Sequence, residues 1–167
     1  ENIKASNMKK NILIVGGSSG VGLALVKLIC QENNVIVASR TNDSISDLPI
    51  TYLPFDVEKD DLDISKIPDQ LNGFVYCPGS INLRPFKGLK QEVFIQDFSI
   101  NVLGAIKTIQ AVQNNLQNCE TPSSVVLFST VAATTGMPFH SSVSTSKGAI
   151  EGLTRSLAAE FAPKIRV

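Results

Sequence analysis

Short apolar runs alternate along the chain with longer segments of mixed character. Each apolar run has the length of a buried strand, and the runs lie at residues 11–15, 35–38, 50–55, 73–77 and 125–128. Between them, apolar residues recur every three or four positions, which predicts helices over residues 21–31, 91–117 and 144–161 and a short, imperfect helix over 60–70. Strands that are apolar throughout are typical of a parallel sheet covered on both faces.

This alternation with short connections predicts a single α/β domain, a Rossmann-type doubly wound parallel β-sheet with helices on both faces. At 167 residues the chain can bury a sizeable core. A sixth strand starts at Ile165–Val167, where the chain stops, so we expect a C-terminal part that closes the substrate pocket to be absent. We also expect Met8 to be the native start, with residues 1–8 outside a domain that spans 9–167.

Composition narrows the possible functions. The 15 basic and 15 acidic residues cancel, and no basic block stands out, which argues against nucleic acid or a membrane surface as a partner. No apolar run approaches the roughly 20 residues of a membrane span. The three cysteines, Cys30, Cys77 and Cys119, are far apart and form no metal-binding pair. We therefore expect reduced thiols, no metal site and a cytoplasmic protein.

A glycine-rich turn joins the first strand to the first helix. Glycines allow a tight turn and let the backbone approach a pyrophosphate, while the helix N-terminus offers free N–H groups. The alternative is an ordinary turn that packs helix on strand. The predicted cofactor-binding residues of this turn are Gly16, Ser18, Ser19, Gly20, Val21 and Gly22.

The end of the second strand bears on which dinucleotide binds. It reads Ser39-Arg40, with no acid before Asp43. A guanidinium suits the 2′-phosphate of NADP, whereas a carboxylate would bind the ribose hydroxyl of NAD. This favours NADP over NAD, unless Arg40 is merely a solvated loop residue. Asp56, after the third strand, could cap a turn or accept a hydrogen bond from the adenine amino group.

Together these segments resemble the short-chain dehydrogenase/reductase family from about Lys9 to Val167. The resemblance implies a cofactor-contacting role for Asp56-Val57 and for Gly79, which lies in Cys77-Pro78-Gly79 where the family usually reads Asn-Ala-Gly. It also implies that Asn101 is a structural and proton-relay residue, that Thr130 stands at the catalytic serine and that Lys147 is the catalytic lysine. The family's members are mostly NAD(P)-dependent oxidoreductases that act on carbonyl or alcohol substrates.

One residue of the family's YxxxK active site is missing. The position four residues before Lys147 is Val143, which cannot exchange a proton. In the family, the lysine lowers the tyrosine pKa and binds the nicotinamide ribose, and the tyrosine exchanges a proton with the substrate oxygen. Other proton sources are His140, which is the only histidine, Ser144, or water relayed through Lys147 and Asn101.

Three hypotheses follow for the chain. It is an NADP-preferring oxidoreductase with an atypical proton donor, a catalytically inactive NADP-binding sensor or partner subunit, or a scaffold with a vestigial site in which Lys147 is an ordinary cation at a helix start. Thr130 could equally be a strand-end residue, Asn101 a polar interface residue and His140 plain surface. Family members often associate through the helices that correspond to 91–117 and 144–161, so we expect a homodimer or homotetramer.

Overall fold

The computed structural model describes residues 9–167, so the expected start at Met8 lies outside the described part. A six-stranded sheet runs through the molecule in the order β3-β2-β1-β4-β5-β6, and every neighbouring pair is parallel. The strands are β1 (Asn11–Val15), β2 (Asn34–Ser39), β3 (Ile50–Pro54), β4 (Gly73–Tyr76), β5 (Ser123–Leu127) and β6 (Ile165–Arg166). The predicted α/β fold with a parallel sheet is confirmed.

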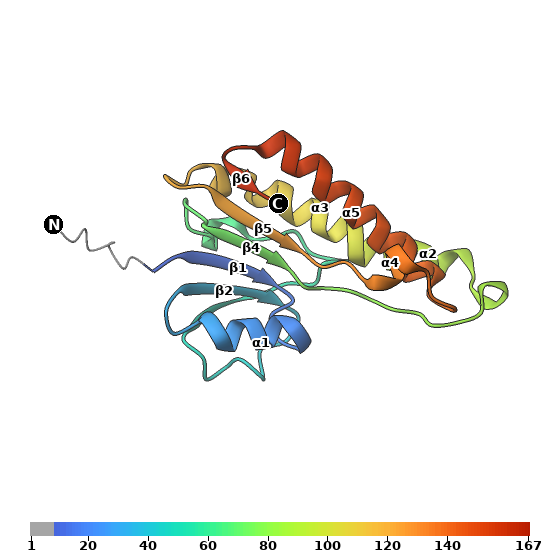
Figure 1. Ribbon diagram of the computed structural model, residues 1–167. Helices are drawn as coiled ribbons and strands as arrows, with labels where there is room; N and C mark the ends of the chain where they lie inside the picture. Colours follow the sequence, from blue (N-terminus) through green and yellow to red (C-terminus); the bar gives the residue numbers. More distant parts are fainter. Residues whose placement is uncertain (1–8) are drawn as a thin grey trace.

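Helices flank the sheet in two layers (Figure 1). Helix α1 lies on one face, and α3 and α5 lie side by side on the other. The α-helices are α1 (Gly20–Ile29), α2 (Gln91–Phe98), α3 (Gly104–Gln117), α4 (Val131–Thr135) and α5 (Ser141–Phe161). The shorter helical segments are η1 (Ile64–Lys66), η2 (Phe86–Gly88) and the π-helical η3 (Ser99–Leu103).

The predicted helix over residues 60–70 is wrong. Only the single turn η1 forms there, and Asp63 caps it by accepting a hydrogen bond from the Ser65 amide. Pro68 follows directly and disfavours helical backbone at the residue before it. Leu62 and Ile67, which suggested the helix, are instead buried in the core from positions on either side of this turn.

The predicted helix over 91–117 is continuous in space but not regular. Its α2 and α3 parts are joined by η3, where one turn is π-helical. The other long helix, α5, starts at Ser141 rather than at 144. Lys147 therefore does not stand at a helix start, as one hypothesis required, and it shares a helix with Val143. Helix α4 was not predicted.

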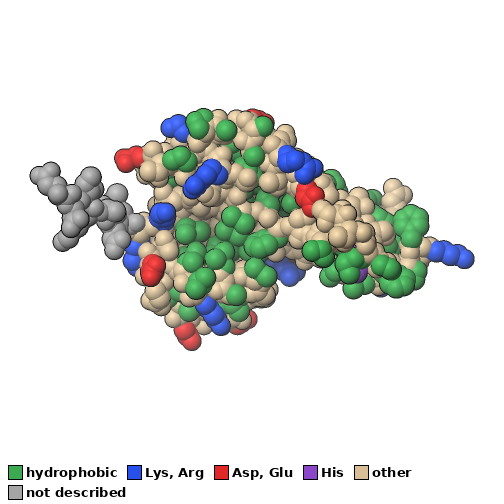
Figure 2. All heavy atoms as spheres, viewed as in Figure 1, with side chains coloured by type: hydrophobic (Ala, Val, Ile, Leu, Met, Phe, Trp, Pro, Cys, Tyr) green, Lys and Arg blue, Asp and Glu red, His purple; other side chains and the backbone are tan. Residues whose placement is uncertain are grey.

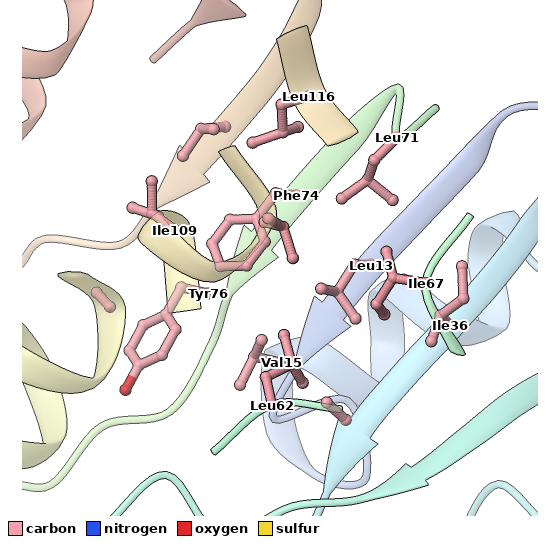
Figure 3. Packing of buried hydrophobic residues seen from close by; sticks show 14 of the residues in the cluster. Leu13, Val15, Ile36, Leu62, Ile67, Leu71, Phe74, Tyr76, Ile109 and Leu116 are labelled. Atoms are coloured by element: carbon pink, nitrogen blue, oxygen red, sulfur yellow. The ribbon is translucent and has the colours of Figure 1, made fainter. Parts of the chain in front are cut away.

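Two apolar clusters hold the layers together. The larger lies between the sheet and the α3/α5 layer, and Figure 3 shows Phe74 and Tyr76 of β4 within it, close to Ile109 of α3. The smaller lies between the sheet and α1 and includes Val26 and Val37, both fully buried. Burial of most of β1, β2 and β4 explains why these strands are largely apolar.

One part of the sheet is not covered on the α1 side. In Figure 2, hydrophobic side chains gather in the middle of the view, where Figure 1 shows β1, β4 and β5 beside α1. Here a hollow of about 400 Å³ is lined mainly by apolar residues of these elements. Val126 of β5, which lies in it, is 45% exposed although it belongs to a central strand.

Candidate active site

The carboxyl ends of the parallel strands converge on a cavity of about 470 Å³. Open α/β sheets bind ligands at this edge, where the strand order reverses between β1 and β4. Ten of the predicted cofactor-binding residues line the cavity: Gly16, Ser18, Ser19, Gly20, Val21, Gly22, Arg40, Asp56, Val57 and Gly79. The structure thus brings together residues that are up to 63 positions apart in the sequence, from Gly16 to Gly79.

The glycine turn forms one wall of the cavity. Gly16 and Gly20 have φ angles of +77° and +54°, values that side chains of other residues rarely tolerate. A Cβ atom on Gly22 would lie 2.3 Å from the Gly16 carbonyl oxygen, so only glycine fits there. Helix α1 begins at Gly20, and the Ser19 side chain makes no capping bond. The N–H groups of the first turn of α1 can bind an anion such as a pyrophosphate. No acidic residue in that turn would repel it.

The ends of β2 and β3 form the opposite wall. The Tyr52 hydroxyl donates to the Ser39 carbonyl (3.0 Å) and the Ser39 hydroxyl donates to the Thr41 carbonyl (2.8 Å), which fixes the backbone on either side of Arg40. Arg40 itself is exposed and lines the cavity. Asp56 accepts a bond from the Glu58 amide (3.0 Å) and pairs with Lys59 (3.6 Å). The wall of the cavity at the ends of β2 and β3 is therefore lined by one cation, Arg40, and by two carboxylates, Asp56 and Glu58.

Lys147 and Asn101 meet behind the end of β4. A Cβ atom on Gly79 would lie 3.1 Å from Asn101 Oδ1 and 3.8 Å from Lys147 Nζ. Asn101 is fully buried, and its Oδ1 has no hydrogen-bond partner within residues 9–167. Burial lowers the pKa of Lys147, while nearby Cys77 opposes this shift. Burial also raises the pKa of Cys77 to about 11, against the effect of Lys147.

None of the predicted catalytic residues is among the residues that line the cavity, although Thr130 directly follows the lining residue Ser129. Thr130 caps α4, where its Oγ1 accepts a bond from the Ala132 amide (3.3 Å). His140 is the N-cap of α5, with its Nδ1 2.7 Å from the Pro138 carbonyl. Ser144 donates to the Ala132 carbonyl (3.1 Å). The side chains of His140 and Ser144 are thus already engaged with the backbone.

Val143 is the point at which the site departs from YxxxK. It lies one helical turn before Lys147 on α5 and is only 5% exposed. It is buried, yet it belongs to neither of the apolar clusters of residues 9–167. The side chain at this position is aliphatic, so it has no proton to give to a substrate or to take from it.

Tyr76 cannot take over from the missing tyrosine. Its hydroxyl packs against Gly104 and donates to the Ile100 carbonyl at 2.5 Å, inside the π-helical segment η3. Burial raises the pKa of Tyr76, and the charge of Glu58 adds to this shift. Tyr76 lies near the cofactor edge of the sheet, at the end of β4, but it is a core residue.

The sequence reasoning missed a polar cluster around Asn101. Asp97, four residues earlier on the same helix, is fully buried and accepts bonds from Ser80, Asn82 and Ser142. No spacing in the sequence distinguishes these residues from ordinary surface polar residues. Cavity residues at strand ends were also missed, although parallel-strand geometry could have found them: Ser39, Phe55, Glu58, Cys77, Phe128 and Ser129.

Known proteins of similar sequence and structure identify the class. A family model described as "short chain dehydrogenase" matches residues 10–167. The chain belongs to the short-chain dehydrogenase family. It is 27% identical to L-2,3-butanediol dehydrogenase of Corynebacterium glutamicum, covering 94% of this chain and 68% of that protein. It is also 27% identical to carbonyl reductase (NADPH) 2 of Sus scrofa, covering 93% and 67%.

A solved structure supports the same assignment. A short-chain dehydrogenase family protein from Francisella tularensis superposes with a TM-score of 0.84 at 25% identity, covering 96% of this chain and 67% of that one. This short-chain dehydrogenase therefore has the fold of a family of NAD(P)-dependent oxidoreductases, and it spans about two thirds of the length of these relatives.

No helix within residues 9–167 is long and apolar enough to span a membrane. No group of three or more histidine, cysteine, aspartate or glutamate side chains there could hold a metal ion.

Proposed function

We propose that this protein is an NADP-preferring oxidoreductase of the short-chain dehydrogenase type, with an atypical proton donor. The observation that carries the proposal is a single cavity in which the glycine turn, Arg40 and Gly79 face one another, with Lys147 directly behind Gly79. When bound, NADPH would supply the hydride that passes to or from a carbonyl or alcohol carbon.

Each wall of the cavity takes a different part of the dinucleotide. The Gly16–Gly22 turn and the start of α1 hold the pyrophosphate, and Ser18 and Ser19 add hydroxyl donors. Arg40 pairs with the 2′-phosphate, a role that a guanidinium fills well. Asp56 accepts from the adenine amino group, and Lys147 binds the nicotinamide ribose. The relative from Sus scrofa, whose name includes NADPH, supports the choice of NADP.

In this proposal, the Lys147 ammonium supplies the proton that the substrate oxygen exchanges, and Asn101 assists by orienting a water molecule. Val143 has no proton to exchange, and the side chains of His140 and Ser144 already contact the backbone. Asn101 Oδ1 is an acceptor without a partner within residues 9–167, beside the Lys147 ammonium, and can orient a water molecule there. Burial lowers the pKa of Lys147, which brings the ammonium closer to a useful proton donor. Thr130 offers a hydroxyl to the substrate oxygen.

A second candidate function is an NADP-binding subunit without turnover. It is favoured by Val143, because the position that exchanges the proton in the family here holds a buried aliphatic side chain. Lys147 and Thr130 would then contact the nucleotide and the pocket without any chemistry.

Titration with NADPH and with NADH tests the cofactor part of the proposal. The chain has no tryptophan, so nucleotide fluorescence can be followed without interference from the protein. NADPH is expected to bind more tightly than NADH, and Arg40→Ala should remove this difference without affecting NADH. Tighter binding of NADH would overturn the NADP preference, and no binding of either would overturn the cofactor site.

A panel of carbonyl substrates separates the enzyme from the inactive binder. We expect the wild type to oxidise NADPH with at least one carbonyl, and His140→Ala to leave that rate unchanged. Lys147→Met should abolish it. An inert wild type with an active Val143→Tyr variant would instead establish the inactive binder, and a strong loss in His140→Ala would make the histidine the acid.

A further inference from the structure

Asp97 of α2 is a fully buried carboxylate that accepts hydrogen bonds only from neutral donors. The Ser80 and Ser142 hydroxyls donate to its two oxygens at 2.5 Å each, and the Asn82 amide donates at 3.0 Å. Neither of the ion pairs within residues 9–167 involves it. A buried carboxylate is costly unless its oxygens are well satisfied, so three donors that converge on one side chain indicate a built arrangement.

The donors come from two segments that border the candidate site. Ser80 and Asn82 lie in the loop after β4, which begins with the cavity residues Pro78 and Gly79. Ser142 lies in the first turn of α5, next to Val143. A backbone bond from Arg84 to Phe139 (3.2 Å) joins the same loop to the segment that leads into α5. Asp97 therefore links the loop that bounds the cavity to the helix that carries Lys147.

The same cluster fixes Asn101. The Asn101 amide nitrogen donates to the Asp97 carbonyl (2.8 Å) and to the Ser80 hydroxyl (3.2 Å). With Nδ2 held in this way, Oδ1 is directed to the point beside Gly79 that Lys147 Nζ also approaches. Removing the Asp97 carboxylate would free Ser80, which is a partner of Asn101, and Ser142 at the same time.

We propose that Asp97 is a positioning residue of the candidate site, whose buried carboxylate holds the loop after β4 against the first turn of α5 and thereby sets Asn101 and Lys147 relative to the bound nucleotide. This inference rests on the proposed NADP-binding function. Asp97 does not touch the nucleotide, since it is fully buried and does not line the cavity. Its effect passes through Ser80 and Ser142.

The test combines nucleotide affinity with amide hydrogen exchange. The variants are Asp97→Asn, Ser142→Ala and Ser80→Ala, with Ser80→Thr as the conservative change, because Ser80 is half-buried and threonine keeps the hydroxyl. Glu92→Gln is the matched control, an exposed carboxylate on the same helix. Exchange is followed at residues 78–83 and 141–147, which the network joins, and at β1 as the core reference.

We expect Asp97→Asn to weaken NADPH binding roughly tenfold, because a hydrogen bond to a charged group is worth about that much. Exchange should rise at 78–83 and 141–147 but not in β1. Ser80→Ala should lose part of the affinity and Ser80→Thr should restore it, while Glu92→Gln should match the wild type. The combination of a local opening with rescue by threonine would not arise from a general loss of stability.

Two results would overturn the proposal. One is unchanged affinity and exchange in Asp97→Asn. The other is faster exchange in β1 by the same factor as in the two segments, which would make Asp97 a residue of global stability only. If the wild type binds neither NADPH nor NADH, the cofactor proposal fails by itself, and the exchange data alone decide whether Asp97 holds the loop to α5.

Discussion

Single backbone positions decide whether a phosphate can approach the glycine turn. At Gly22 a methyl group would meet the Gly16 carbonyl at 2.3 Å, and backbone atoms cannot move away as a flexible side chain could. In the proposed cofactor site the motif would serve two purposes, because the glycines that let helix α1 pack closely on the turn would also leave the helix N-terminus open to an anion.

The first prediction concerns this glycine. Gly22→Ala is expected to remove measurable NADPH binding and to cost about 1–3 kcal/mol of stability, the usual range for overpacking. Gly148→Ala is the control, since a Cβ there meets nothing within 4 Å and lies in a helix. The control should bind NADPH as tightly as the wild type, and its stability should rise by a few tenths to about 1 kcal/mol. Fluorescence titration and thermal unfolding measure both, and wild-type affinity in Gly22→Ala would contradict the prediction.

A second prediction uses the pH dependence of Cys77. Its pKa is raised by burial from 9.0 to about 11, so the folded protein retains a proton that the unfolded chain loses first. Stability is then fully present below pH 9 and is lost as the pH rises through about 11. We expect Cys77→Ala to reduce the loss of stability between pH 9 and 11, as measured by urea unfolding at several pH values. An equal loss in wild type and variant would contradict it.

Residues of the candidate site differ in how readily the sequence revealed them. Gly16, Gly20 and Gly22 could be found because the turn chemistry needs glycine at a fixed place between a strand and a helix. Asp97 and Ser142 could not be found, since they lie 45 positions apart and polar residues on a predicted helix are usually exposed. Their meeting depends on how α2 packs against α5, which no local pattern encodes.

At the scale of elements, the most unusual feature is the π-helical segment η3 between α2 and α3. A π turn leaves its carbonyls offset from the regular ladder, and here the Ile100 carbonyl accepts the bond from Tyr76. Asn101 follows directly. The segment thus anchors the long helix to the end of β4 at the level where Asn101 reaches the site.

The third prediction tests this anchor. Gly104→Ala would place a Cβ 2.3 Å from both the Tyr76 hydroxyl and the Val57 side chain. We expect a loss of about 1–3 kcal/mol of stability. Gly152→Ala, in the open on α5, should not destabilise. If the Tyr76 hydroxyl is the obstacle, Tyr76→Phe should partly relieve the loss of stability in Gly104→Ala, as measured by chemical denaturation. Fully additive effects of the two changes would contradict the role of this contact as an anchor.

Elements were predictable where periodicity and burial agree. Strands β1, β2 and β4 were predictable because most of their residues are buried, and α1 and α3 because one face packs on the sheet. The helix over 60–70 was wrong because Leu62 and Ile67 reach the core from positions outside the single turn η1, and Pro68 disfavours helical backbone at Ile67. The first turn of α5 was missed because His140 and Ser141 form no side-chain cap that the sequence could signal.

At the scale of the whole molecule, the two layers do not expose the same kinds of surface. The α1 side leaves part of the sheet bare (Figure 2), whereas α3 and α5 lie against the other face of the sheet (Figure 1). Among the helices of that side, Ile95 of α2 is 60% exposed and Leu103 of η3 is 51% exposed. Alternating strands and helices predicted the layers, but not which surfaces stay apolar.

The last prediction concerns association of the protein through α2–α3 and α5. If copies meet there, Ile95 and Leu103 become buried, and a lysine at either place would carry an unpaired charge into the contact. The double variant Ile95→Lys, Leu103→Lys should therefore be a monomer by light scattering, while the wild type is a dimer or tetramer. Leu28→Lys is the control, because Leu28 is 78% exposed on α1, in the opposite layer. A monomeric wild type would contradict the association, and loss of association in Leu28→Lys alone would place the contact on the α1 layer.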